Sequence, residues 1–141
     1  MMQDDFILYG QRLQSRLLLG TSRYPSPAVL ARAIERSRPG MLTASLRRQT
    51  AGGDSHSGFW DLLRQCGVPV LPNTAGCHSI QEVLTTAEMA REVFETDWIK
   101  LELIGDDYTL QPDTLNLVDC ADRLLRMGFR VLPYSTDDLV L

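Results

Sequence analysis

The clearest chemical signal in this 141-residue sequence comes from Lys100 and Glu102. Both lie in the segment Trp98–Ile104, which alternates apolar with charged side chains. Successive side chains of a β-strand point to opposite faces, so these two are same-face neighbours, about 6.6 Å apart along the strand. A neutral primary amine attacks carbonyl carbon to give a Schiff base, and a nearby carboxylate can move the protons involved. The pair therefore predicts carbonyl chemistry.

Lysine usage strengthens this prediction, because Lys100 is the only lysine beside 13 arginines. A guanidinium stays protonated and cannot form an imine, so arginine would not serve here. Burial favours the neutral amine, whereas the neighbouring carboxylate favours the ammonium ion, and the sequence leaves open which effect is larger. The alternative interpretation is that Lys100 and Glu102 form a partly buried ion pair with no catalytic role.

Weaker candidates follow two other predicted strands. The run Pro69–Gly76 leads into a loop where Asn73 and Thr74 would bind substrate, although ordinary turn chemistry explains an asparagine there equally well. Asp137 and Asp138 follow the last predicted strand, where capping of a helix is the more common role. Two histidines and three cysteines lack metal-ligand spacing, so we expect no metal and no other cofactor.

The elements that must position these residues alternate along the chain. The starts of the apolar segments are about 24 to 32 residues apart, which is typical of parallel strands joined by helices. A hairpin around Leu8–Gln14 is predicted to precede them. Strands are predicted at Leu17–Gly20, Met41–Leu46, Val68–Leu71, Trp98–Ile104 and Arg130–Tyr134. Helices are predicted at Pro25–Ser37, Gly58–Cys66, Ser79–Phe94 and Pro112–Met127, with a loop at Gly52–Gly58.

Two observations favour a (β/α)8 barrel over an open doubly wound sheet. The segment Gly20–Tyr24 after the first strand lacks a glycine-rich phosphate fingerprint. Charged residues in Trp98–Ile104 suit a strand that points polar groups into a barrel mouth. Ser135–Leu141 reads as a strand end followed by the start of a helix. We therefore expect residues 1–141 to form one α/β domain, the first five β/α units of an incomplete barrel.

Composition excludes several classes of function. The net charge of −4 and the pI near 5.1 argue against non-specific binding of nucleic acid, which requires a basic face. The apolar stretches are shorter than the ~20 residues of a membrane span, and no basic, apolar leader begins the chain. An odd number of cysteines without a CxxC pair suits reduced thiols. We expect a cytoplasmic protein.

Five blocks of the sequence resemble one family, the bacterial thiazole synthases of thiamine biosynthesis. The segments LPNTAG and KLE, which contain Asn73 and Lys100, are the most diagnostic. The blocks are Ser15–Thr21, Leu71–Gly76, Asp97–Glu102, Leu110–Asp113 and Gly128–Tyr134. The chain is similar to the N-terminal half of that family, whose later strands supply a further aspartate and the glycine-rich phosphate loops.

The resemblance implies a fold, a reaction and partners. The family fold is a (β/α)8 TIM barrel, and Lys100 matches the lysine that forms a Schiff base with 1-deoxy-D-xylulose 5-phosphate. Glu102 matches the neighbouring acid–base carboxylate. Sulfur arrives as a thiocarboxylate on a small ubiquitin-like carrier protein, and a dehydroglycine imine comes from an enzyme that associates with the synthase. The family is homo-oligomeric.

Two other hypotheses remain open from the sequence. The chain can be a non-catalytic half-barrel that self-associates through open sheet edges or needs a complementing half. It can also be a Schiff-base lyase of the aldolase type, which shares the barrel and the lysine but not the sulfur chemistry. Retro-aldol turnover without a carrier protein distinguishes that lyase from a thiazole synthase.

Overall fold

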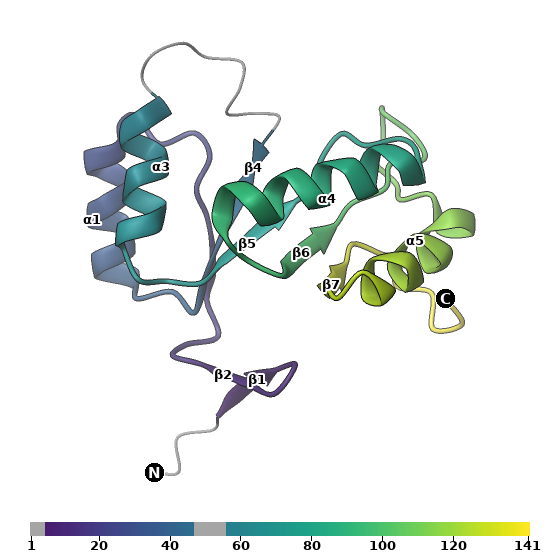
Figure 1. The fold of residues 1–141 in the computed structure, drawn as a ribbon, viewed down its shortest axis with the longest axis horizontal. Coiled ribbons are helices and arrows are strands. Elements are labelled where there is room, and N and C mark those ends of the chain that lie inside the picture. The colour runs from purple at the N-terminus through teal and green to yellow at the C-terminus, as the bar shows by residue number, and fades with distance from the viewer. Residues whose placement is uncertain (1–4, 47–55) are drawn as a thin grey trace.

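A five-stranded parallel sheet forms the centre of the computed structural model, which describes residues 5–46 and 56–141 (Figure 1). The strands lie in chain order, each paired with the next, and the order never reverses as it does in doubly wound sheets. The strands are β3 (Leu18–Gly20), β4 (Met41–Ser45), β5 (Val70–Asn73), β6 (Trp98–Leu101) and β7 (Arg130–Pro133). The predicted parallel α/β fold is confirmed, and the sheet is consistent with part of a TIM-like barrel.

Four helices connect the strands in the described part of the chain, and their ends carry the expected caps. The side chain of Ser26 accepts a hydrogen bond from the Val29 amide, and that of Ser79 from the Glu82 amide. Gly128 follows the last helix at φ +84°, the left-handed region that favours glycine. The helices are α1 (Pro27–Ser37), α3 (His56–Gln65), α4 (Ile80–Phe94) and α5 (Thr114–Arg126). No helix among these is long and apolar enough to cross a bilayer.

Two predictions about loops and ends have different outcomes. Most of the predicted loop Gly52–Gly58 lies outside the described residues, and α3 already begins at His56. The predicted helix start within Ser135–Leu141 is wrong, since that segment is not helical. There the Asp138 amide donates to the Thr136 hydroxyl, and Asp138 in turn accepts from a later amide. Such bonds between side chain and backbone close local turns, which are an alternative to a helix.

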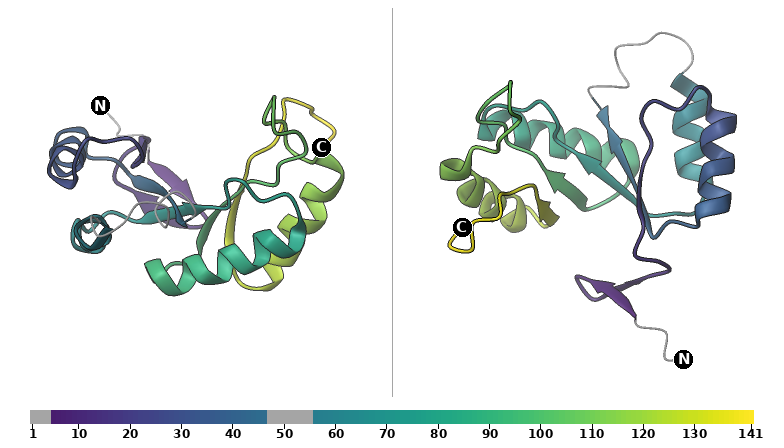
Figure 2. Two further views of the ribbon diagram at one scale, coloured as in Figure 1. Left: turned by 90° about the horizontal axis from the view of Figure 1, so that it is seen from above. Right: turned by 180° about the vertical axis from the view of Figure 1, so that it is seen from behind.

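All four described helices pack against one face of the sheet. The strand residues on that face alternate with those on the other, as the period of two requires. They join two apolar clusters, one with α1 and α3 and the other with α4 and α5. The strand residues in these clusters are Leu42, Ala44, Val70, Ile99, Leu101 and Val131. Seen from above, the strands follow a curve with α4 and α5 on its outer side (Figure 2).

The opposite face, here called the inner face, is closed at its amino end by a two-stranded hairpin. Strands β1 (Phe6–Leu8) and β2 (Gln11–Leu13) are antiparallel, which confirms the predicted hairpin. Tyr9 and Gly10 form its turn with φ of 48° and 74°, as a type I′ turn requires. The hairpin packs on an apolar layer of the inner face, made of Met41, Leu71, Trp98 and Leu132.

Tyr9 fastens this hairpin to the edge of the sheet. Its hydroxyl donates to the carbonyl oxygen of Val131 at 2.8 Å and accepts from the Val131 amide at 3.1 Å. The Tyr9 ring meets the Trp98 ring edge-on, with centroids 5.6 Å apart. The hairpin therefore both covers the apolar layer and occupies the free backbone groups of β7 at Val131.

Candidate functional site

Beyond the apolar layer, the inner face becomes polar towards the carboxyl ends of the strands. The register places Ser45 beside Asn73, and Asn73 beside Lys100, across three adjacent strands. We call Thr43, Ser45, Asn73, Lys100 and Glu102 the polar layer. Carboxyl ends of parallel strands are where barrels and open α/β sheets build their active sites.

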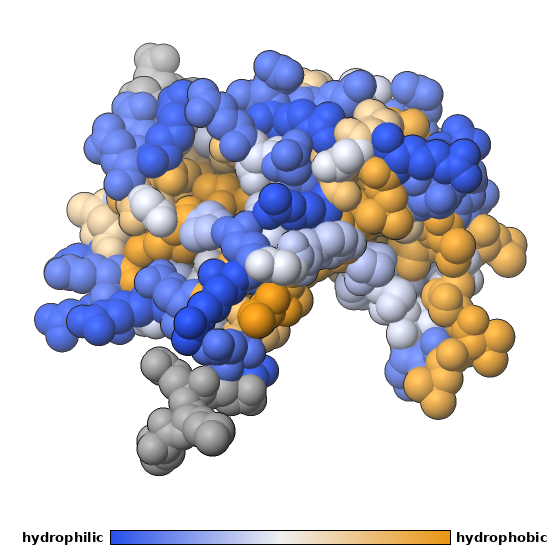
Figure 3. Space-filling view, turned by 60° about the horizontal axis from the view of Figure 1, so that its bottom comes forward, coloured by the Kyte–Doolittle hydropathy of each residue, from blue (hydrophilic) through white to orange (hydrophobic). Residues whose placement is uncertain are grey.

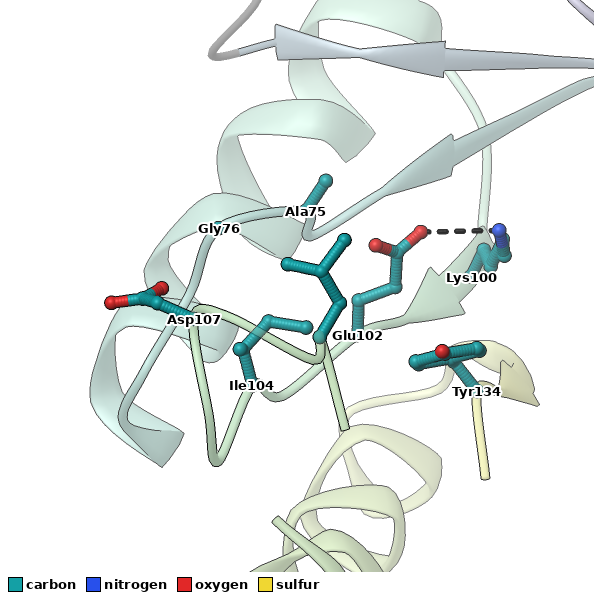
Figure 4. Close-up of a pocket in the computed structure, with 8 residues that line it drawn as sticks. Ala75, Gly76, Lys100, Glu102, Ile104, Asp107 and Tyr134 are labelled. Atoms are coloured by element: carbon teal, nitrogen blue, oxygen red, sulfur yellow. Dashed lines mark ion pairs between the residues drawn. The ribbon is translucent and has the colours of Figure 1, made fainter. Parts of the chain in front are cut away.

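Lys100 and Glu102 form an ion pair within the polar layer. The Lys100 Nζ lies 3.1 Å from the Glu102 Oε1, and the two side chains are 38% and 17% exposed (Figure 4). Ile99 and Leu101, which flank the lysine, point to the helices instead. The shared face predicted from the alternation is therefore confirmed. The catalytic role of the pair stays a prediction, because the structure also fits the alternative of an ion pair alone.

Two hollows meet at this ion pair. The larger has a volume of about 440 Å³, and the smaller, polar one about 290 Å³. These volumes suit a small metabolite, since ligand pockets range from about 300 to 1,000 Å³. Besides the pair, the larger hollow is lined by Ala75, Gly76, Ile104, Asp107, Leu110 and Tyr134. The pair is thus accessible to a small carbonyl compound.

Asn73 and Thr74, predicted to bind substrate, have different positions. Asn73 lines the smaller hollow, and its Oδ1 accepts from the Ala75 amide at 3.2 Å. Thr74 is fully buried, and its hydroxyl exchanges two 2.8 Å hydrogen bonds with the backbone N–H and C=O of Glu102. The substrate contacts of both residues stay predictions. The two bonds of Thr74 hold the backbone of Glu102 in place.

The structure adds residues that the sequence analysis does not single out. Tyr134 lines the larger hollow directly after β7, and its amide donates to the Leu101 carbonyl at 2.8 Å. Tyr134 stands at the end of a predicted strand, and this position could have identified it as a candidate site residue from the sequence. Ser45 also joins the site, whereas Asp137 and Asp138 line neither hollow.

The loop after β6 forms one wall of the larger hollow. Hydrogen bonds from the Thr109 side chain and amide lower the pKa of the Asp106 carboxyl below its ordinary value. The adjacent Asp107 carboxylate lies 3.2 Å from the Nε2 of His78, which precedes α4. These contacts fix the loop but do not make a metal site. Within residues 5–46 and 56–141, no three His, Cys, Asp or Glu side chains cluster to hold a metal ion.

The fold and the site together define a class of protein. It is a β/α protein with helices on the outer face and a lysine–carboxylate pair at the carboxyl ends of its strands. Residues 7–141 match the family model described as "Thiazole biosynthesis protein ThiG". The chain belongs to this family of enzymes, the thiazole synthases of thiamine biosynthesis.

Curated relatives agree with the family assignment. The thiazole synthase of Variovorax paradoxus (strain S110) is 70% identical over 141 residues, which cover 98% of this chain and 52% of the relative. That of Paracidovorax citrulli (strain AAC00-1) is 71% identical over 139 residues, with the same coverage. The thiazole synthase of Neisseria gonorrhoeae (strain ATCC 700825 / FA 1090) is 63% identical over 134 residues, covering 94% of this chain and 51% of the relative. The chain spans about half the length of these relatives.

A solved structure supports the fold independently. The match is a chain of the Amycolatopsis orientalis BexX/CysO complex, with a TM-score of 0.77 and 20% sequence identity. It covers 95% of this chain and 55% of that chain. At 20% sequence identity, this likeness supports the fold alone.

Proposed function

We propose that this chain carries the Schiff-base half of a thiazole synthase site. Lys100 would form an imine with the ketone carbon of 1-deoxy-D-xylulose 5-phosphate, on the way to thiazole phosphate. The observation that carries the proposal is the 3.1 Å pair of Lys100 Nζ and Glu102 Oε1 between two open hollows. A simple surface ion pair would not need the protein's only lysine at this position.

In the proposed step, the Glu102 carboxylate first accepts a proton and later returns it. Glu102 takes a proton from the Lys100 ammonium, and the neutral amine attacks the ketone carbon. A proton then passes from the attached nitrogen to the alkoxide oxygen, which gives a carbinolamine. The protonated Glu102 then gives its proton to the departing hydroxyl, which leaves as water, and a protonated imine remains. The Thr74 hydroxyl donates to the Glu102 carbonyl and accepts from the Glu102 amide, and these two bonds would hold the residue in place for both transfers.

The remainder of the reaction is proposed to need more chain than residues 1–141. We propose that these residues are the N-terminal five units of a (β/α)8 barrel. Support comes from sequential strand order, helices on one face only among the described residues, and coverage of about half of each relative. The phosphate loops and a further catalytic aspartate would lie in the later units. Cytoplasmic location and a homo-oligomeric state are part of the same proposal.

Two protein partners complete the proposal. A ubiquitin-like carrier protein would deliver sulfur as a thiocarboxylate, and a second enzyme would supply the dehydroglycine imine. The carrier is supported by the solved structure of matching fold, which is the BexX/CysO complex. The proposal of an imine-supplying enzyme as a partner rests on the family assignment.

Trapping of the imine tests the proposal. The folded chain is incubated with 1-deoxy-D-xylulose 5-phosphate and sodium cyanoborohydride, and its intact mass is measured. The expected gain is one sugar phosphate less one oxygen atom, since water leaves and two hydrogens are added. Lys100→Arg is the control, because it keeps the charge but cannot form an imine. Absence of the gain in a folded chain, or an equal gain in the control, would overturn the proposal.

The second candidate function is a non-catalytic half-barrel that self-associates. One observation favours it: α5 exposes Leu115 and Val118, at 93% and 57% of their surfaces. Figure 3 shows hydrophobic side chains at the surface on the side where α5 and the C-terminus lie, and others at the centre and on the opposite side of the view. Sedimentation velocity would give a defined dimer that Leu115→Glu dissociates, together with no imine adduct. A monomer would contradict this candidate.

A further inference from the structure

The hydroxyl of Ser45 has no partner in the described structure. Ser45, at the end of β4, is only 8% exposed, and its Oγ makes no hydrogen bond there. Leaving a buried hydroxyl without a partner destabilises the folded state. Native proteins keep few such groups, and each one calls for an explanation such as a bound molecule.

The position of Ser45 indicates what would bind there. Its side chain lines the 290 Å³ hollow, in register with Asn73 and then Lys100 on the next two strands. Neighbouring strands lie about 4.8 Å apart, so roughly 10 Å separates the Ser45 backbone from that of Lys100. A ligand that reacts at the lysine and reaches Ser45 therefore extends across the strands.

The lining of the smaller hollow selects the chemical class of that ligand. Thr21, Thr43, Ser45 and Asn73 offer neutral hydroxyl and amide groups. The Thr21 hydroxyl donates to the Thr43 carbonyl at 2.8 Å, which leaves its oxygen lone pairs to accept. Carbon-bound hydroxyl groups, which both donate and accept, match this surface.

We infer that the Ser45 hydroxyl forms a hydrogen bond with one hydroxyl of the proposed ketone substrate, whose carbon chain lies in the smaller hollow. The carbonyl end of the ketone lies at Lys100, and its hydroxyls extend over β5 and β4. This inference rests on the proposed function, because it assumes that the lysine receives a ketone. It makes Ser45 a specificity-determining residue rather than a catalytic one.

Imine trapping with two ketones tests the role of Ser45. The concentration for half-maximal adduct is measured with 1-deoxy-D-xylulose 5-phosphate and with butanone, which has no hydroxyl. Ser45→Ala is expected to raise it about five- to tenfold for the sugar phosphate, the effect of one hydrogen bond. For butanone it is expected to remain unchanged. Ser37→Ala removes a hydroxyl from α1, outside both hollows, and is expected to change neither value.

Thermal unfolding separates binding from a structural role. Ser45→Ala is expected to melt no lower than the unchanged chain, because the substitution removes a hydroxyl that has no partner. A lower melting temperature with equal effects on both ketones would overturn the inference. So would an unchanged half-maximal concentration for the sugar phosphate, and that result would leave the proposed function standing. No adduct in the folded, unchanged chain would instead overturn the proposed function, and the inference with it.

Discussion

The two ends of the inner face are built from the same strands but have opposite chemistry. At the amino end, Leu71 and Trp98 are buried under the hairpin in the apolar layer. Two residues further along the same strands, Asn73 and Lys100 line a polar hollow. The comparison teaches that position along a parallel strand decides whether a side chain of the inner face is packed in an apolar layer or lines a polar hollow.

The largest effect on stability is expected from a substitution in the apolar layer. Trp98→Ala removes a ring that is 4% exposed and contacts Tyr9, so it should lower the free energy of unfolding by about 3–5 kcal/mol. Asn73→Ala, on the adjacent strand in the polar layer, loses one turn hydrogen bond and should cost about 1 kcal/mol. Urea denaturation measures both. Equal losses would show that the two layers do not differ as described.

Next in size is the loss of proton transfer in the polar layer. Glu102→Gln keeps the side-chain shape but cannot take the proton from Lys100, so adduct formation should be about a hundredfold slower. The free energy of unfolding should change by about 1 kcal/mol or less, because the pair is partly solvated. Asp138→Asn, outside both hollows, is the control with an unchanged rate. An unchanged rate in Glu102→Gln would remove the carboxylate from the mechanism.

A smaller effect tests how the carboxylate is positioned. Thr74→Val keeps the shape of the side chain but leaves the backbone N–H and C=O of Glu102 without their partner. It should lower the free energy of unfolding by about 2 kcal/mol and also slow adduct formation. Thr74→Ser restores the hydroxyl and should recover most of both. If only stability changes, Thr74 does not position the carboxylate for the reaction.

The smallest effect lies on the outer face, in the cluster that packs on α5. Burial raises the pKa of the Cys120 thiol from 9.0 to about 11. The folded state therefore keeps a proton that the unfolded state releases as the pH rises, so stability is complete below pH 9 and falls towards pH 11. Cys120→Ala should flatten this slope in urea denaturation at several pH values. If the free energy of unfolding falls as steeply with pH in the variant, titration of groups other than Cys120 causes the loss.

The sequence was sufficient for features that local periodicity dictates. The shared face of Lys100 and Glu102 follows from the strand period of two, and the inward direction follows from the apolar Ile99 and Leu101 that alternate with them. Likewise, Ser79 with Glu82 predicts the start of α4 because a cap bonds to an amide three residues away.

Features that depend on distant contacts could not be predicted in this way. The bonds between Thr74 and Glu102 join residues 28 positions apart, and the unpartnered Ser45 is apparent only once the strands are in register. The C-terminal segment failed for a local reason, since the side chains of Thr136 and Asp138 close turns with the amides two residues further on, and no helix follows in this segment.

The most direct test of the central claim is the position of the trapped sugar phosphate. The chain offers two primary amines, Lys100 and the α-amino group of Met1, so each molecule contains its own comparison. After reduction, peptide mapping by fragmentation mass spectrometry locates the adduct. The account predicts that the adduct lies on Lys100, with little on Met1. An even distribution between the two amines, or an adduct confined to Met1, would contradict a site built around the lysine.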